Sequence, residues 1–195
     1  MCNFNVRFRR IAALCGLISP IISLSTILIS VVMIADFSWQ ANDLSDMGVS
    51  ATPNLFNFGL IVTGLLSVIF AVGVTRWIGP DRSAHIGSAA LIIGSFDVAL
   101  IGVITEAYGP LHFWVSVAYF VLVPISYLFL SRNLWRKGKK IASRLSIAAG
   151  LTVLMMMALR KVLTHDSGVA VPETLSAMIT NAWTFGLALM LWLDS

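Results

Sequence analysis

Six long apolar stretches alternate with short polar segments along this chain. The stretches cover residues 11–35, 54–75, 85–105, 111–131, 141–159 and 174–193. A helix of ~20 residues, rising about 1.5 Å per residue, crosses a hydrocarbon core about 30 Å thick. The pattern therefore predicts an all-α fold, a polytopic membrane bundle of six transmembrane helices that forms one domain over residues 1–195.

Composition points to the same class of protein. Hydrophobic residues make up 58% of the chain and charged residues only 11%. A soluble domain with so few charges would expose large apolar patches and aggregate, so composition argues against a soluble protein. We expect a multi-pass protein of the plasma membrane.

The polar segments carry opposite charges on alternate sides of the predicted membrane. Eleven of the thirteen Lys and Arg residues fall on the side that also holds both termini, and only Arg160 and Lys161 fall on the other. Loops rich in Lys and Arg stay in the cytoplasm, which predicts cytoplasmic N- and C-termini. The opposite side holds six of the nine carboxylates, namely Asp36, Asp43, Asp46, Glu106, Asp166 and Glu173.

The positions of the basic residues also bear on partners. They gather at the ends of the apolar stretches, which is typical of membrane orientation and not of nucleic-acid binding. Membrane lipid is thus the expected partner, and nucleic acid is not. A homo-oligomer and a larger membrane complex both stay open.

Two polar stripes run along predicted helices and begin on the acidic side. The stripe in the fourth stretch contains His112, Ser116, Tyr119 and Ser126, and the stripe in the sixth contains Glu173, Ser176, Thr180 and Thr184. A helix in lipid turns a polar line toward partner helices or water. We therefore expect both stripes to face the inside of the bundle.

Asp97 lies near the middle of the third stretch. An ionised carboxylate at that depth costs at least ~2.5 kcal/mol, so its side chain should face the bundle or a water pocket. It is either a proton or ion relay, or a neutral acid bonded to a hydroxyl. Small residues such as Gly64 and Gly94 let helix backbones approach closely, so we expect the second and third helices to be central in the bundle.

Short motifs on the acidic side indicate a family. They are N-x-L-S-D-x-G at Asn42–Gly48, Asn57, E-x-x-x-P-x-H at Glu106–His112, and the pair Pro172–Glu173. In their order and spacing on six spans, they resemble a prokaryotic six-span membrane family, the domain of unknown function numbered nine hundred and ninety-eight. The resemblance covers almost the whole chain and implies the fold, but it implies no established activity.

Four acid–base side chains come from three different connections on the acidic side and are our candidate catalytic residues: Asp46, Glu106, His112 and Glu173. If they converge, carboxylates and an imidazole could hold a divalent metal such as Zn²⁺ or Mn²⁺ and activate water. Alternatively, Glu173 could be a general base and His112 a proton donor. The candidate binding residues beside them are Asn42, Ser45, Asn57, Asp97 and Tyr119.

Several functions are compatible with these residues. The same groups could simply lock the connecting loops and cap helix starts, as an acid in the first turn of a helix does. They could form the site of a membrane enzyme that acts on a lipid or small molecule. The protein could also bind or transport a small solute or lipid, or serve as an accessory subunit of a membrane complex.

Overall fold

The computed structural model describes residues 2–160 and 168–195, with side chains from residue 6 onward. Six of its helices are long and apolar enough to cross a membrane, which confirms the six predicted spans. They are α1 (Cys2–Met33), α2 (Pro53–Ile78), α3 (Arg82–Val103), α4 (Pro110–Arg136), α5 (Lys140–Ala158) and α7 (Ala170–Leu193). Two 3-10 helices, η1 (Leu44–Val49) and η2 (Glu106–Tyr108), lie in the connections after α1 and α3.

Local sequence sets several of these helix ends. Pro53 and Pro110 begin α2 and α4, where the N–H that proline lacks has no helical partner anyway. The Asp81 carboxylate caps α3 by accepting a backbone N–H of its first turn at 2.7 Å. The turn after α4 contains Gly138, whose φ of +77° favours glycine.

The first helix is longer than expected. It begins at Cys2 and not near residue 11, because the basic segment ahead of the apolar stretch contains no Gly or Pro that would end a helix. Proline also occurs inside two helices, at Pro20 of α1 and Pro124 of α4. Neither residue ends its helix.

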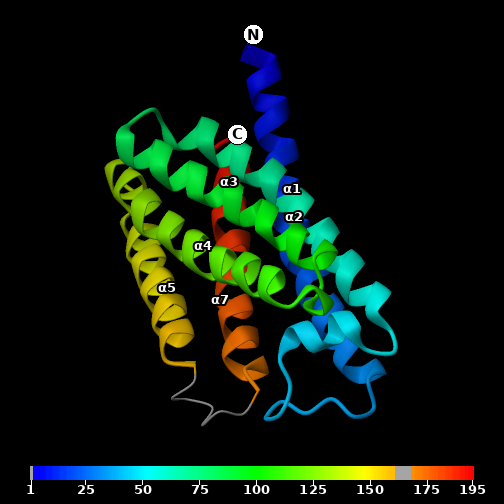
Figure 1. Ribbon diagram of the computed structural model, residues 1–195. Helices are drawn as coiled ribbons and strands as arrows, with labels where there is room; N and C mark the ends of the chain where they lie inside the picture. The colour runs from blue at the N-terminus through cyan, green and yellow to red at the C-terminus, as the bar shows by residue number, and fades with distance from the viewer. Residues whose placement is uncertain (1, 161–167) are drawn as a thin grey trace.

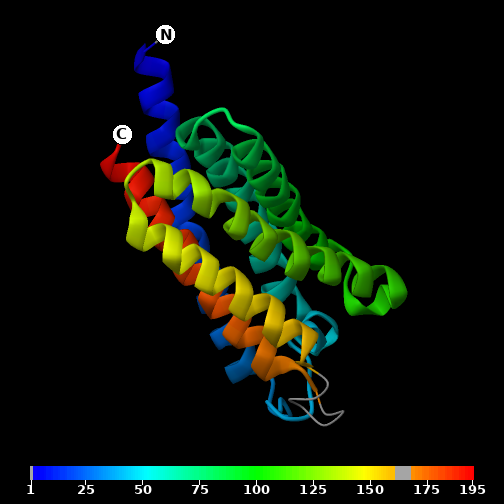
Figure 2. The ribbon, with the colours of Figure 1, turned by 90° about the vertical axis from the view of Figure 1, so that its left-hand side faces the viewer.

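The helices form a closed ring around a central space. Each helix contacts the next in the order α1, α2, α3, α4, α5, α7, and α7 returns to α1 (Figure 1). The contact between α5 and α7 is the least extensive in this ring. In Figure 2 the connection between α3 and α4 leans away from the other helices.

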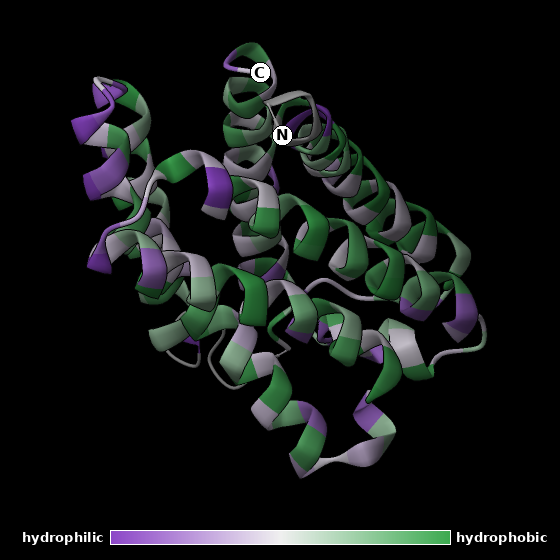
Figure 3. Ribbon diagram, turned by 90° about the horizontal axis from the view of Figure 1, so that it is seen from above, coloured by the Kyte–Doolittle hydropathy of each residue, from purple (hydrophilic) through white to green (hydrophobic). Residues whose placement is uncertain are grey.

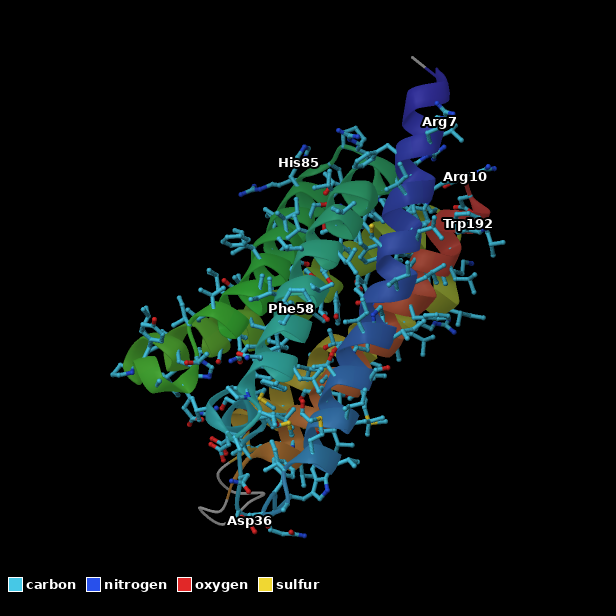
Figure 4. The ribbon with its side chains drawn as sticks, turned by 90° about the vertical axis from the view of Figure 1, so that its right-hand side faces the viewer. Arg7, Arg10, Asp36, Phe58, His85 and Trp192 are labelled. Carbon is cyan, nitrogen blue, oxygen red and sulfur yellow. The ribbon has the colours of Figure 1, made fainter. Side chains whose placement is uncertain are left out.

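The two ends of the bundle differ in charge. Arg7, Arg10 and Trp192 lie at one end and Asp36 at the other (Figure 4). We refer to these as the basic end and the acidic end; both termini are at the basic end (Figure 1). At the basic end, cationic side chains lie over rings, such as Arg10 over Trp192 at 5.8 Å. Hydrophilic residues gather at helix ends and turns, and hydrophobic residues run along the helices (Figure 3).

Large apolar side chains cover the outside of the ring. Val32, Phe58 and Trp114 are exposed, which suits a surface that faces acyl chains. Inside, the half of the ring nearer the basic end is a packed cluster that includes Val74, Leu134 and Leu191. This cluster closes the centre of the bundle at the basic end.

The second and third helices are not central as predicted, because both are members of the ring, but a small residue does bring them close together. A Cβ added to Gly64 of α2 would meet the backbone of Ala99 on α3 and lie 2.8 Å from the Cβ of Ala99. Such close approach lets helices gain van der Waals contact where lipid offers little hydrophobic drive.

Candidate functional site

The segment after α1 folds into a compact turn at the acidic end. The side-chain amide of Asn42 accepts the backbone N–H of Ser38 at 2.9 Å and donates to Asp46 Oδ2 at 2.7 Å. The same oxygen of Asp46 accepts the backbone N–H of Asp43 at 3.0 Å. Asn42 and Asp46 therefore hold the start of η1 in place.

This turn is fastened to the start of α7. The backbone N–H of Leu44 donates to Glu173 Oε2 at 2.8 Å. The Asp43 carboxylate accepts the backbone N–H of Val169 at 2.7 Å, and the N–H of Ala170 donates to a backbone carbonyl of the turn at 2.9 Å. Glu173 thus satisfies a backbone donor of η1 at the same time as it stands in the first turn of α7.

Asn57 of α2 fastens the far end of η1. Its side-chain amide donates to the carbonyl oxygen of Gly48 at 2.9 Å. A Cβ on Gly48 would lie 2.6 Å from Asn57 Oδ1, so a larger residue there would displace the Asn57 side chain from this position. The N-x-L-S-D-x-G motif and Asn57 together explain how η1 is held against three helices.

Glu106 of η2 lies beside η1 and close to Asp46. Burial raises the pKa of Glu106 to about 7; hydrogen bonding and repulsion from Asp46 add to this, whereas the Ser45 hydroxyl opposes it. One carboxyl oxygen of Glu106, Oε2, is buried without a hydrogen-bond partner among the described residues. Glu106 therefore takes up or releases a proton near pH 7.

His112 does not join the carboxylates. Its Nδ1 lies 2.6 Å from the carbonyl oxygen of Ile104, so this nitrogen carries the proton. Its Nε2 lies 3.4 Å from the Ser116 hydroxyl. The imidazole therefore closes the end of α3, and this contact explains the histidine of the E-x-x-x-P-x-H motif.

The hypothesis of a metal site at Asp46, Glu106, His112 and Glu173 gains no geometric support. Among residues 2–160 and 168–195, no group of three or more His, Cys, Asp or Glu side chains is arranged to hold a metal ion. Asp46 and Glu173 both spend oxygen lone pairs on backbone N–H groups. These carboxylate oxygens therefore hold the protein's own loops in place.

A cavity with a volume of about 110 Å³ lies in the centre of the ring. It reaches the acidic end at Leu44, Ser45 and Glu173, and it extends inward to Phe70 and Tyr127. Its polar lining consists of Ser23, Ser45, Thr63, Ser67, Ser95, Ser116, Tyr119, Tyr127, Glu173, Thr180, Asn181 and Thr184. The apolar lining comes from side chains such as Phe56 and Phe120.

Most of the two predicted stripes meet across this cavity. Ser116 and Tyr119 line it from α4, and Glu173, Thr180 and Thr184 line it from α7. The remaining stripe residues do not line it; the Ser126 hydroxyl, for example, bonds to a backbone carbonyl of its own helix at 2.6 Å. The expectation that these faces point inward is thus confirmed.

The lining contains two fully buried hydroxyl oxygens that have no hydrogen-bond partner among the described residues. Thr63 is 6% exposed and Tyr127 is fully buried, yet neither Oγ1 of Thr63 nor the phenol oxygen of Tyr127 is paired. A buried polar group without a partner costs roughly 1–3 kcal/mol, so such groups are normally satisfied by water or a ligand. The described protein groups leave both hydroxyls unsatisfied.

The structure distributes the predicted site residues among different roles. Ser45, Tyr119 and Glu173 line the cavity, whereas Asn42, Asn57 and Asp46 position η1. Asp97 is buried, and its Oδ2 has no partner among the described residues, but it is not part of the lining.

Sequence reasoning missed several residues of the cavity. Thr63 sits in an apolar stretch without a predicted stripe, whereas Asn181 directly follows Thr180 of the stripe in the sixth stretch. Tyr127 follows Ser126, where the predicted stripe of α4 ended, and this adjacency was the one available signal. The side chain of Asn181 donates to the Ser23 hydroxyl at 3.1 Å, a contact between the last and first helices that no local pattern indicates.

Comparison with known proteins yields one match. A family model described as "Protein of unknown function (DUF998)" matches residues 17–190, which is most of the chain. No curated protein and no solved structure matches it.

Proposed function

The chain belongs to the DUF998 family of proteins of unknown function, and we propose that it binds a small amphiphilic molecule in its central cavity. The observation that carries this proposal is the pair of buried, unpartnered hydroxyls of Thr63 and Tyr127 on the cavity wall. These unpaired hydroxyls favour a bound molecule that supplies the missing hydrogen bonds.

The size and chemistry of the cavity suit part of a larger molecule. Its volume is about 110 Å³; an apolar cavity of about 150 Å³ accommodates a benzene ring. The aromatic side chains of Phe56, Phe70 and Phe120 offer an apolar surface between the hydroxyls. A short alkyl chain or a single ring with one polar head fits this mixture.

The cavity is closed toward the basic end, which favours binding over passage. Beyond Phe70 and Tyr127 the ring is filled by the packed cluster that includes Val74, Leu134 and Leu191. A transporter needs a second opening, whereas a receptor or carrier of a membrane-soluble compound does not. We therefore favour a binding protein.

We propose that the acidic end faces away from the cytoplasm and that the bundle lies in the plasma membrane. The support is the gathering of Lys and Arg at the basic end, because basic loops stay on the cytoplasmic side. A reporter protein fused after Ser195 should be found on the cytoplasmic side of the membrane. Activity of the same reporter outside the cell would overturn this orientation.

A membrane enzyme is the second candidate, and the observation that favours it is Glu106, whose carboxyl group lies beside Ser45 of the cavity lining. Its pKa is raised to about 7, first by burial and then by Asp46, which suits a general acid or base at neutral pH. In this case a bound compound would be recovered chemically changed, and Glu106→Gln would abolish the change without abolishing binding. Recovery of the compound unchanged would leave binding as the function.

A cavity-filling variant tests the binding proposal directly. Ala177 lines the cavity, so Ala177→Phe should fill it. Hexanol should raise the melting temperature of the detergent-solubilised wild type and leave that of Ala177→Phe unchanged. Ala89→Phe, on the exposed face of α3, is the matched control and should keep the wild-type response. Equal responses in all three proteins would contradict the proposal.

A further inference from the structure

Building on the proposed binding function, we infer that the cavity selects a positively charged ligand, a protonated amine on a short apolar body, whose ammonium group pairs with Glu173. Nothing about the family assigns this ligand class. The inference rests on the charge of the lining, the environment of Glu173 and the unpaired groups deeper in the cavity.

The lining carries one carboxylate and no cationic side chain. Among the described lining residues, Glu173 is the acid, and Lys, Arg and His do not occur. An anionic ligand would therefore bring a second negative charge into a space of low dielectric constant without a compensating partner. Because this second negative charge has no partner, we expect phosphate and carboxylate compounds not to bind in the cavity.

Glu173 has unused capacity for hydrogen bonds. An ionised carboxylate has about four acceptor sites, and in this structure one donor occupies Glu173, the backbone N–H of Leu44 at 2.8 Å. An ammonium group has three donors and a full positive charge. It would satisfy the remaining acceptors and neutralise the carboxylate, which a neutral alcohol does only in part.

The acidic end adds a field that attracts cations. Asp36, Asp43 and Asp46 lie at the same end of the bundle as Glu173, and Arg160 is the described cation of that end. The Arg160 guanidinium lies over the ring of Phe113 at 5.6 Å, away from the lining. The three aspartates thus outnumber the described cation at this end, which raises the local concentration of cationic solutes.

The deeper part of the cavity fits the apolar body of such a ligand. Aromatic rings of Phe56, Phe120 and Tyr119 line it, and such rings attract a nearby cation as well as alkyl groups. The hydroxyls of Thr63 and Tyr127 have no partner among the described residues. This is a separate observation that favours a bound molecule as their hydrogen-bond partner. The carboxylate, the aromatic rings and the unpaired hydroxyls therefore all favour the same class of ligand, an amine on a short apolar body.

Three probes of equal chain length test the inference. Hexylamine is protonated, hexanol is neutral and hexanoate is anionic near neutral pH. Each is titrated by calorimetry into the full chain in a non-ionic detergent, with empty micelles as the blank. We expect hexylamine to bind about tenfold more tightly than hexanol, the usual gain for a charge-assisted bond, and hexanoate not to bind measurably.

The variant Glu173→Gln isolates the charge. Glutamine keeps an oxygen that can accept the Leu44 N–H, so η1 stays fastened, but it removes the negative charge. Binding of hexylamine should fall about tenfold, to the level of hexanol, while hexanol changes less than about twofold. Asp36→Asn removes an exposed carboxylate of the same end outside the lining and should change neither value.

Each outcome of this experiment is decisive. If hexylamine and hexanol bind the wild type equally, or if Glu173→Gln leaves hexylamine binding unchanged, the inferred charge selectivity is wrong and the binding cavity stands. If none of the probes binds the wild type above the micelle blank, the proposed function fails as well. The wild-type comparison needs no variant, so a misfolded Glu173→Gln protein still leaves the inference testable.

Discussion

The carboxylate of Glu173 accepts the backbone N–H of Leu44 at 2.8 Å, although the two residues are 129 positions apart in the chain. Leu44 begins η1 and Glu173 stands in the first turn of α7, and both residues line the central cavity. One bond therefore joins the turn after the first helix to the last helix at the acidic end of the cavity.

Removing this bond should destabilise the protein in a way that depends on the replacement. Glu173→Ala leaves the Leu44 N–H unpaired and should lower the free energy of unfolding by about 1.5–3 kcal/mol, the cost of losing a bond to a charged group. Glu173→Gln retains an acceptor and should cost clearly less. Denaturant unfolding in detergent measures both, and hydrogen exchange of the Leu44 amide should accelerate only in Glu173→Ala. Equal losses for both variants would contradict a role for this bond.

Two glycines in the membrane spans should respond oppositely to alanine. Gly64→Ala forces a Cβ against Ala99 of the neighbouring helix, so it should destabilise the bundle by about 1–3 kcal/mol. Gly186 has no atom within 4 Å of an added Cβ, and Gly186→Ala should leave stability unchanged or raise it by up to about 1 kcal/mol through helix propensity. The melting temperatures of the two variants decide the point; a neutral Gly64→Ala would show that α2 and α3 are not in close contact.

The stability of the protein should fall as pH rises through neutrality, in part because of Glu106. Its pKa in the folded chain is about 7, above the ordinary value of 4.5, with burial as the main cause and Asp46 next. The folded state thus binds the proton more tightly than the unfolded state. The associated stability is fully present below about pH 4.5 and is lost as pH rises through about 7.

The variant Glu106→Gln should flatten this part of the pH profile, and Asp46→Asn should reduce it by lowering the pKa of Glu106. Melting temperatures recorded across this pH range for the three proteins test both statements. An identical slope in wild type and Glu106→Gln would show that Glu106 titrates at its ordinary value.

The variant Tyr127→Phe should show whether the Tyr127 hydroxyl binds a ligand or stabilises the fold. The Tyr127 hydroxyl is fully buried and unpaired among the described residues, so its removal should leave the ligand-free protein equally stable or more stable, by up to about 1 kcal/mol. The same change should weaken binding of a hydrogen-bonding guest. A structural tyrosine would show the reverse, a less stable protein with unchanged binding; melting curves with and without hexanol distinguish the two.

The fold could be predicted closely from the sequence because lipid imposes a simple rule. Every crossing must be a long apolar helix, so the six apolar stretches and the polar segments between them are enough to locate the spans. Local signals such as Pro53 and Asp81 also mark several helix ends. The start of α1 was missed because helices can continue into polar surroundings when nothing breaks them.

The site was predicted in part, for a physical reason that particular residues illustrate. Periodicity showed that Tyr119 and Glu173 lie on inward faces, and both line the cavity. Periodicity does not say which partner a side chain finds. His112 turned to the backbone of Ile104, whereas Asp46 closed a local turn. These choices depend on distances between segments far apart in the chain, as does the placement of Thr63 on the cavity wall.

The most direct test of a central binding site is a structure determined with bromine-tagged hexylamine. An anomalous bromine signal should appear inside the ring of helices, within the cavity lined by Phe120, Tyr127 and Thr63, with the amine beside Glu173. Bromine found only on the lipid-facing surface, with the cavity filled by side chains, would contradict a binding site at the centre of this bundle.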